Sequence, residues 1–146
     1  MTSVKLSKRL NTISRLVPDG SVVFDVGSDH ALLPCHLVES GKCAKAYAGD
    51  NKREPLKRAE ANIKKYHLEG RVIPVLSDGL DEAPEDADTV VISGMGFFTM
   101  RDILEKCDTS RYERFILEAN KDVNLLRNYI NEKKYSIIDE YALEED

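Results

Sequence analysis

The sequence predicts one domain of the α/β class: a doubly wound, mostly parallel sheet with helices on both of its faces. Short apolar runs rich in β-branched residues alternate along the chain with longer segments whose apolar residues recur at helical spacing. This alternation is typical of parallel strands joined by helical crossovers. A length of 146 residues suits a single core. We therefore expect one domain over 1–146, with an N-terminal helix at 1–17 and the core at 22–146.

Local patterns place each element in order. Leu6, Leu10 and Ile13 recur at helical spacing and predict the opening helix. The basic residues expected on its solvent side are Lys5, Lys8, Arg9 and Arg15. Apolar runs predict strands at 22–26, 44–48, 71–76, 89–93 and 114–118. Helical patterns predict further helices at 31–40, 54–66, 97–107 and 122–134, the last with Asp122 as its N-cap.

The first strand ends in a turn that carries two carboxylates. Asp25-Val-Gly27 after a buried strand is how many doubly wound domains begin a cofactor site. A dinucleotide-binding loop needs a second glycine where Asp29 stands, and a carboxylate there would repel a pyrophosphate. A carboxylate favours a cationic ligand instead. The turn therefore predicts S-adenosylmethionine, a nucleoside cofactor that carries a positively charged sulfonium.

Ligands of such sheets bind beyond the carboxyl ends of the strands, where this chain places several carboxylates and glycines. Asp50, after the second strand, suits the two ribose hydroxyls of a nucleoside. Asp78, after the third, suits the exocyclic amine of an adenine, although either residue could simply belong to a turn. The residues expected to bind the cofactor are Asp25, Gly27, Ser28, Asp29, His30, Asp50, Asn51, Asp78, Gly79, Ser93, Gly94 and Met95.

The fourth strand is followed by Gly94-Met95-Gly96, whose glycines would let the backbone approach a substrate base. The chain lacks the Asn/Asp-Pro-Pro-aromatic motif of enzymes that methylate exocyclic amines, which favours a ring nitrogen as the acceptor. Phe97 and Phe98 could stack on a flipped-out base, although a Phe pair that opens a helix is also typical of a core. Asp29 and Asn120 are the catalytic candidates: Asp29 would stabilise developing positive charge, and Asn120 would orient the base with the 94–96 backbone.

Charge is distributed unequally between the two halves of the chain. Residues 1–77 carry a formal charge of +5 and residues 78–146 a charge of −10. A basic half favours a polyanionic partner, for which Lys5, Lys8 and Arg9 are the candidate contacts, although two solvated faces would show the same asymmetry.

The rest of the composition indicates a cytoplasmic protein. Cys35, Cys43 and Cys107 lack metal-binding or redox spacing and are expected to be buried thiols. No apolar run is long enough to span a membrane, and the first five residues lack the apolar core of a signal peptide. We therefore expect a cytoplasmic location, no membrane partner and no metal.

Four motifs together resemble one known family. They are Lys5-Leu-Ser-Lys-Arg-Leu10, Asp25-Val-Gly-Ser-Asp-His30, Ser77-Asp-Gly-Leu80 and Ser93-Gly-Met-Gly96. Over nearly the whole chain they are similar to the bacterial tRNA (adenine-22-N1)-methyltransferases, the TrmK family. The resemblance implies a Rossmann-like class I domain that uses S-adenosylmethionine to methylate N1 of an adenosine in the tRNA D-arm. It also implies that Asp29, Asp50 and Asp78 line the cofactor site.

The chain departs from that family around the expected acceptor pocket and at its end. Phe97 stands where members tend to have glycine, Glu118-Ala119-Asn120 where they tend to have Gln-Pro-Asn, and Glu54-Pro55-Leu56 where Gly-Pro-Tyr is common. Residues 135–141 predict a sixth strand. Class I methyltransferases usually finish with a two-stranded hairpin, and this family adds a helical C-terminal extension. We therefore expect the C-terminal strands to be truncated.

Two other functions stay open. A methyltransferase-like module that binds S-adenosylmethionine but has no tRNA activity in this short form would carry the same motifs. An NAD-dependent oxidoreductase would suit the first strand and Asp50, although Asp29 and Ala31 replace two glycines that its loop requires.

Overall fold

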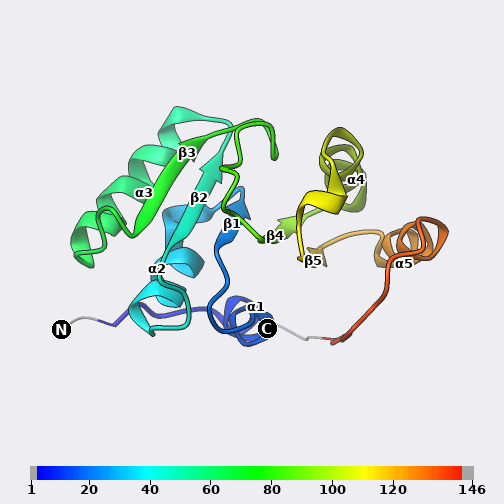
Figure 1. The fold of residues 1–146 in the computed structure, drawn as a ribbon, viewed down its shortest axis with the longest axis horizontal. Helices are drawn as coiled ribbons and strands as arrows, with labels where there is room; N and C mark the ends of the chain where they lie inside the picture. The colour runs from blue at the N-terminus through cyan, green and yellow to red at the C-terminus, as the bar shows by residue number, and fades with distance from the viewer. Residues whose placement is uncertain (1–2, 143–146) are drawn as a thin grey trace.

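A computed structural model describes residues 3–142 as an α/β fold built on one sheet of five parallel strands (Figure 1). The strands are β1 (Val23–Val26), β2 (Ala46–Asp50), β3 (Val72–Leu76), β4 (Thr89–Met95) and β5 (Arg114–Ala119). The helices are α1 (Lys8–Leu16), α2 (Leu32–Glu39), α3 (Arg53–Lys65), α4 (Phe97–Lys106) and α5 (Val123–Glu132). The strand order is β3-β2-β1-β4-β5, so the winding direction reverses between β1 and β4. The predicted fold class is confirmed.

The helices cover the sheet in two separate layers. α1, α2 and α3 pack on one face and α4 and α5 on the other, as their separation in Figure 1 shows. Strand side chains alternate between the layers, so Val23 belongs to the first core and its neighbour Phe24 to the second. Both faces of the central strands are therefore buried, as expected for a doubly wound sheet.

The opening helix is shorter than the sequence predicts. The Ser7 hydroxyl accepts a hydrogen bond from the Leu10 N–H at 3.2 Å, so Ser7 is the N-cap and α1 begins at Lys8. Residues 3–7 are not helical, and residues 1–2 of the expected helix lie outside the described part of the chain. Val4 is buried, and its N–H donates to a Glu39 carboxylate oxygen at 2.9 Å. This contact ties the segment before α1 to α2.

The ends of several elements differ from the prediction. β2, expected at 44–48, runs from Ala46 to Asp50. β4 does not stop at Ser93, because an irregularity at Gly94, with φ +76°, lets the strand continue to Met95. Asp122 does precede α5 as the N-cap residue, but its left-handed backbone leaves the side chain without a capping hydrogen bond.

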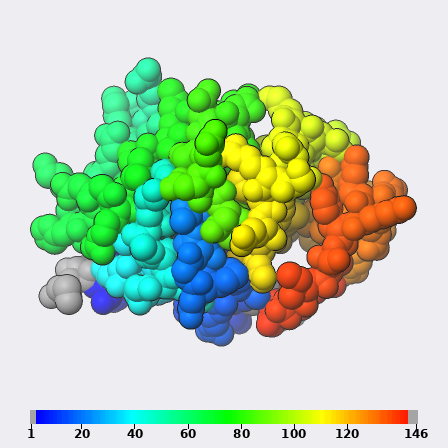
Figure 2. All heavy atoms as spheres, viewed as in Figure 1, coloured from blue at the N-terminus to red at the C-terminus, as the bar shows by residue number. Residues whose placement is uncertain are grey.

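The predicted sixth strand at 135–141 does not form. Its apolar side chains are exposed, and no strand of residues 3–142 pairs with it. A segment rich in aromatic and β-branched residues forms a strand only where a neighbouring strand edge supplies hydrogen bonds. Instead, the segment is tethered to its surroundings by the Tyr135 hydroxyl, 3.0 Å from Thr109 Oγ1, and by an Arg127–Glu140 ion pair. Figure 2 shows the orange and red atoms of α5 and this segment on the outer side of the molecule.

The three cysteines of the chain are free thiols that differ in burial. Cys35 and Cys43 are buried free thiols, and Cys107 is half-buried, so the expectation of full burial is wrong only for Cys107. Within residues 3–142 we find no helix with the length and apolar character needed to cross a membrane.

Gly49 of β2 packs closely against Phe24 of β1, and a substitution at this glycine tests how tight the packing is. A Cβ at residue 49 would lie 2.5 Å from Cζ of Phe24, whose ring is fully buried and cannot move aside. We expect Gly49→Ala to lower the free energy of unfolding by about 1–3 kcal/mol in urea denaturation. Combining it with Phe24→Leu should cost less than the sum of the two single changes. Additive effects would contradict the packing argument.

Candidate functional site

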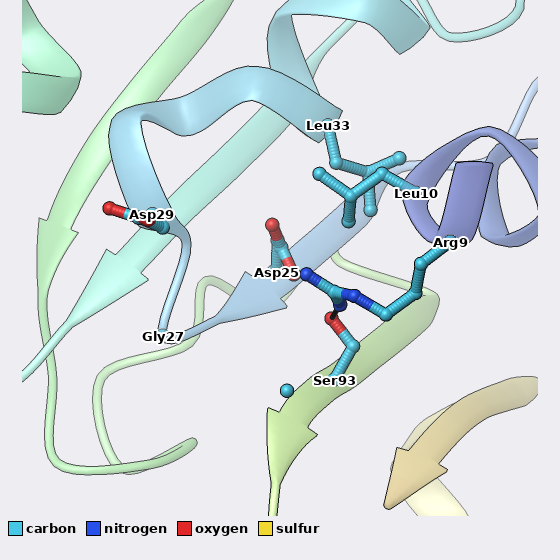
Figure 3. A pocket seen from close by; sticks show the side chains of 8 residues that line it. Arg9, Leu10, Asp25, Gly27, Asp29, Leu33 and Ser93 are labelled. Atoms are coloured by element: carbon cyan, nitrogen blue, oxygen red, sulfur yellow. Dashed lines mark hydrogen bonds between the residues drawn. The ribbon is translucent and has the colours of Figure 1, made fainter. Parts of the chain in front are cut away.

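A cavity of about 180 Å³ lies at the carboxyl ends of β1 and β4, at the point where the strand order reverses (Figure 3). This is the position at which open α/β sheets bind ligands. The lining residues are Arg9, Leu10, Asp25, Gly27, Asp29, Leu33, Ser93 and Gly94. The cavity therefore brings together five of the residues predicted for the cofactor, and it adds Arg9 from α1.

Strand alternation decides which polar side chains lie on the same side of the sheet as this cavity. Asp25, Ser93 and Glu118 each lie two residues after a side chain buried in the core beneath α1–α3, namely Val23, Val91 and Ile116. Residues two apart share a face of a strand, so all three polar groups reach the same side of the sheet. Each strand thus supplies its core first and its site residue at its carboxyl end.

Asp25 is the most deeply buried acid of the site, with 5% of its surface exposed. Burial raises the pKa of its carboxyl from the usual 3.8 to about 7, while the nearby Ser28 side chain and the Arg9 guanidinium act in the opposite direction. The Ser28 hydroxyl is itself buried and makes no hydrogen bond of good geometry with the described residues. The end of β1 and the turn after it therefore hold a buried carboxyl with a pKa of about 7 and a buried hydroxyl with unused hydrogen-bonding capacity.

Arg9 corrects the sequence prediction, which placed it on the solvent side of the opening helix. Its guanidinium lies 3.1 Å from a Glu118 carboxylate oxygen and 3.3 Å from Ser93 Oγ. Figure 3 shows the side chain extending from α1 toward Ser93 and Asp25. Arg9 is therefore part of the cavity wall and does not extend into solvent as a phosphate contact would.

Glu118 and Asn120 hold the end of β4 from both sides. Glu118 Oε1 accepts the Gly94 N–H at 3.0 Å, and the Asn120 side-chain amide donates to the Gly94 carbonyl at 3.2 Å. The Asn120 N–H also donates to the Met95 carbonyl at 3.0 Å. Both polar groups of Gly94 are thus fixed by the segment at the end of β5.

The turn after β1 has an uncommon backbone. Gly27, His30 and Ala31 have φ of +67°, +56° and +56°, a region that side-chain-bearing residues rarely enter. The Asn62 side chain on α3 donates to the His30 carbonyl at 2.8 Å and so holds this turn from outside. The Asp29 side chain is 79% exposed, lies 3.3 Å from His30 Nε2, and is turned away from Asp25 in Figure 3. Asp29 is a residue of the cavity rim.

Asp50, the last residue of β2, and Asp78, just after β3, lie on the same sheet edge but do not line the cavity. Asp50 is half-buried, and its carboxylate accepts the Lys52 N–H at 3.0 Å, with Asn51 exposed beside it. Asp78, next to Gly79, is 67% exposed and pairs with Lys106 at 3.1 Å. The parallel register places Asp50 between the β1 turn and the end of β3. The two acids therefore extend the site along the edge of the sheet.

Phe97 contradicts its predicted role in base stacking. Its ring is 5% exposed and packs edge-on against Tyr129 of α5, with centroids 5.8 Å apart. Phe98 is 51% exposed, and the Arg101 guanidinium lies 5.2 Å from its ring centre. Gly96 is half-buried at the N-cap of α4. Of the two rings, only Phe98 is available to a ligand.

Two residues of the site, Glu118 and Asn62, are not among the site residues predicted from the sequence. Glu118 follows Ile116 on one face of β5, and a polar residue at a strand's carboxyl end is a signal that alternation could have revealed. Asn62 gives no such signal, because its partner is a backbone carbonyl 32 residues away. Among residues 3–142 no three His, Cys, Asp or Glu side chains are grouped as a metal site would require.

Known proteins match this chain in sequence and in fold. A family model described as a methyltransferase domain matches residues 6–146. The tRNA (adenine(22)-N(1))-methyltransferase of Bacillus subtilis is 38% identical over 149 residues, which cover all of this chain and 63% of the relative. The structure of M. capricolum TrmK with S-adenosyl-homocysteine has a TM-score of 0.89 and 35% identity, over 97% of this chain and 64% of that one.

A structure of Streptococcus pneumoniae Sp1610 in complex with S-adenosyl-L-methionine adds a third match. Its TM-score is 0.90 at 34% identity, and the match covers 97% of this chain and 68% of that one. The fold and the cavity at the strand-order reversal thus define a class I methyltransferase domain. Within this class the chain belongs to the TrmK family of tRNA (adenine-22-N1)-methyltransferases. It spans about 63% of the length of its B. subtilis relative.

The raised pKa of Asp25 makes a prediction about stability. The folded pKa of about 7 exceeds the usual 3.8, so the folded protein binds more protons between these values and loses stability as pH rises through them. The full effect is about 4 kcal/mol. Asn at residue 25 cannot ionise, so Asp25→Asn should not lose stability in this way. The free energy of unfolding of Asp25→Asn, measured in urea, should therefore rise relative to that of the wild type between pH 5 and pH 8. An advantage independent of pH would contradict this. Asp19→Asn, in an exposed turn, is the control.

Proposed function

We propose that this chain binds S-adenosylmethionine at the β1–β4 cavity and transfers its methyl group to N1 of an adenosine in the D-arm of tRNA. The observation that carries the proposal is the position of this cavity beside three successive acids, Asp29, Asp50 and Asp78, at the carboxyl ends of β1, β2 and β3. Solved relatives contain S-adenosyl-homocysteine and S-adenosyl-L-methionine, which supports the choice of cofactor.

The residues present fit such a cofactor. Ser28 offers a buried hydroxyl without a hydrogen bond of good geometry, and Gly27 has a positive φ and is exposed at the cavity. We expect Asp50 to accept hydrogen bonds from the ribose hydroxyls and Asp78 to accept one from the adenine amine. These bonds would replace the present contacts of Asp50 with the Lys52 N–H and of Asp78 with Lys106. Asp29 at the rim would face the positively charged part of the cofactor. These assignments use carboxylates for a ligand that carries donors and a cation.

The chain's contribution to methyl transfer would be positioning. S-Adenosylmethionine supplies the methyl group on its sulfonium, so the protein needs no covalent intermediate. Asn120 and the Gly94–Gly96 backbone would orient the base, since Asn120 already fixes this backbone through the Gly94 carbonyl. Methylation of N1 makes the adenine cationic, and Asp29 would stabilise the developing charge.

Exposed residues around the cavity would contact the rest of the tRNA. Lys5 and Lys8 are exposed in and before α1, and Phe98 is exposed at the start of α4. Two lysines would bind phosphates, and the Phe98 ring would stack on a base. A tRNA substrate would also place the protein in the cytoplasm, as the sequence predicts.

Calorimetry followed by mass spectrometry tests this function. We expect S-adenosylmethionine and S-adenosylhomocysteine to bind with one-to-one stoichiometry and NAD not to bind. Incubation of unmethylated tRNA with this chain and S-adenosylmethionine should then add one methyl group to an adenine of the D-arm. Cofactor binding without methylation would favour the binding-module alternative, and binding of NAD in place of the other two would favour an oxidoreductase.

Asp29→Ala tests the electrostatic role separately. Loss of the rim carboxylate should reduce methyl transfer by about 100-fold or more, because charge would develop without its stabilising partner. Asp19→Ala removes an exposed acid from the turn before β1 and should leave turnover unchanged. The measurement is kcat from the release of S-adenosylhomocysteine. Near-normal turnover in Asp29→Ala would rule out this role.

A further inference from the structure

We infer that Glu118 is a positioning residue of this site, with two tasks: it holds the Gly94 backbone, and it cancels the charge of Arg9 so that the cavity accepts a cationic ligand. The inference deepens the proposed function and rests on it for the identity of the ligand.

The first task follows from geometry. A single oxygen, Glu118 Oε1, accepts from both the Gly94 N–H at 3.0 Å and the Arg9 guanidinium at 3.1 Å. The Gly94 N–H belongs to the irregular end of β4, where the backbone has φ +76°. The register of the β4–β5 pairing shifts between Ser93 and Met95, and the Glu118 carboxylate accepts the N–H that lies at this shift. Glu118 therefore links α1, β4 and β5 at one atom.

The second task follows from charge. The Arg9 and Glu118 side chains are 31% and 25% exposed, so solvent screens their charges only in part. Arg9 lines the cavity, and a guanidinium is always protonated. Asp25 shares the cavity but is buried and is only partly ionised near neutral pH. Glu118 lies within ion-pair distance of Arg9 and offsets its charge, which would otherwise repel a sulfonium or a methylated adenine.

The two tasks can be separated by two substitutions. Glu118→Gln keeps an oxygen that can accept the Gly94 N–H but removes the negative charge. Glu118→Ala removes both the oxygen and the charge. Glu113, exposed just before β5, provides the matched control variants Glu113→Gln and Glu113→Ala.

Calorimetry with two cofactor forms tests charge cancellation without requiring turnover. S-Adenosylmethionine is cationic at sulfur, whereas S-adenosylhomocysteine is neutral there. Glu118→Gln should raise the Kd for S-adenosylmethionine about tenfold more than the Kd for S-adenosylhomocysteine. Adding Arg9→Gln should restore the wild-type ratio of the two constants, because the uncompensated charge is removed. Equal changes in both constants, or no change in either, would overturn charge cancellation.

Hydrogen exchange of the Gly94 amide, followed by NMR in the ligand-free protein, tests the holding role. We expect exchange at least about tenfold faster in Glu118→Ala, near-normal exchange in Glu118→Gln, and no change in either Glu113 variant. Unchanged exchange in Glu118→Ala would overturn the holding role. If the wild type binds neither cofactor form, the proposed function and charge cancellation both fail, while the exchange result still decides whether Glu118 holds Gly94.

Discussion

The site depends on the burial of the central strands on both faces. Each of these strands presents apolar side chains to two helix layers, and polar side chains are accommodated only toward its carboxyl end. Asp25, Ser93 and Glu118 occupy these ends on the α1–α3 side. The reversal of strand order between β1 and β4 then separates the crossover helices and leaves room beside these residues. The cavity is a consequence of how the sheet is wound.

Much of this architecture was predictable, because it rests on short-range patterns. Apolar runs located all five strands, and the carboxylate in the β1 turn identified the end of the sheet that holds the cavity. Errors arose where a long-range partner decides the outcome. The chain at 135–141 has the composition of a strand but no neighbouring edge among the described residues. Phe97 has a ring suited to stacking on a base, but Tyr129, far along the chain, buries it.

Arg9 illustrates the same limit within the site. A basic residue on an amphipathic helix is expected in solvent, and its neighbours Lys5 and Lys8 are exposed. Arg9 instead faces Ser93 and Glu118, which the local sequence around α1 cannot reveal. Arg9 is half-buried there, close to the carboxyl groups of Glu118 and Asp25. The site proposed for a cationic ligand therefore contains a cation of its own, and the carboxylates around it determine the local potential.

The Arg9–Glu118 pair joins residues 109 positions apart, from the first helix to the last strand. Arg9, which lines the cavity, is therefore held in place by Glu118 only after almost the entire described chain has folded. Binding and global folding are consequently coupled. A ligand held here stabilises the whole sheet through mass action, and partial unfolding at either end of the chain releases it. During synthesis, this site is one of the last features of the domain to become complete.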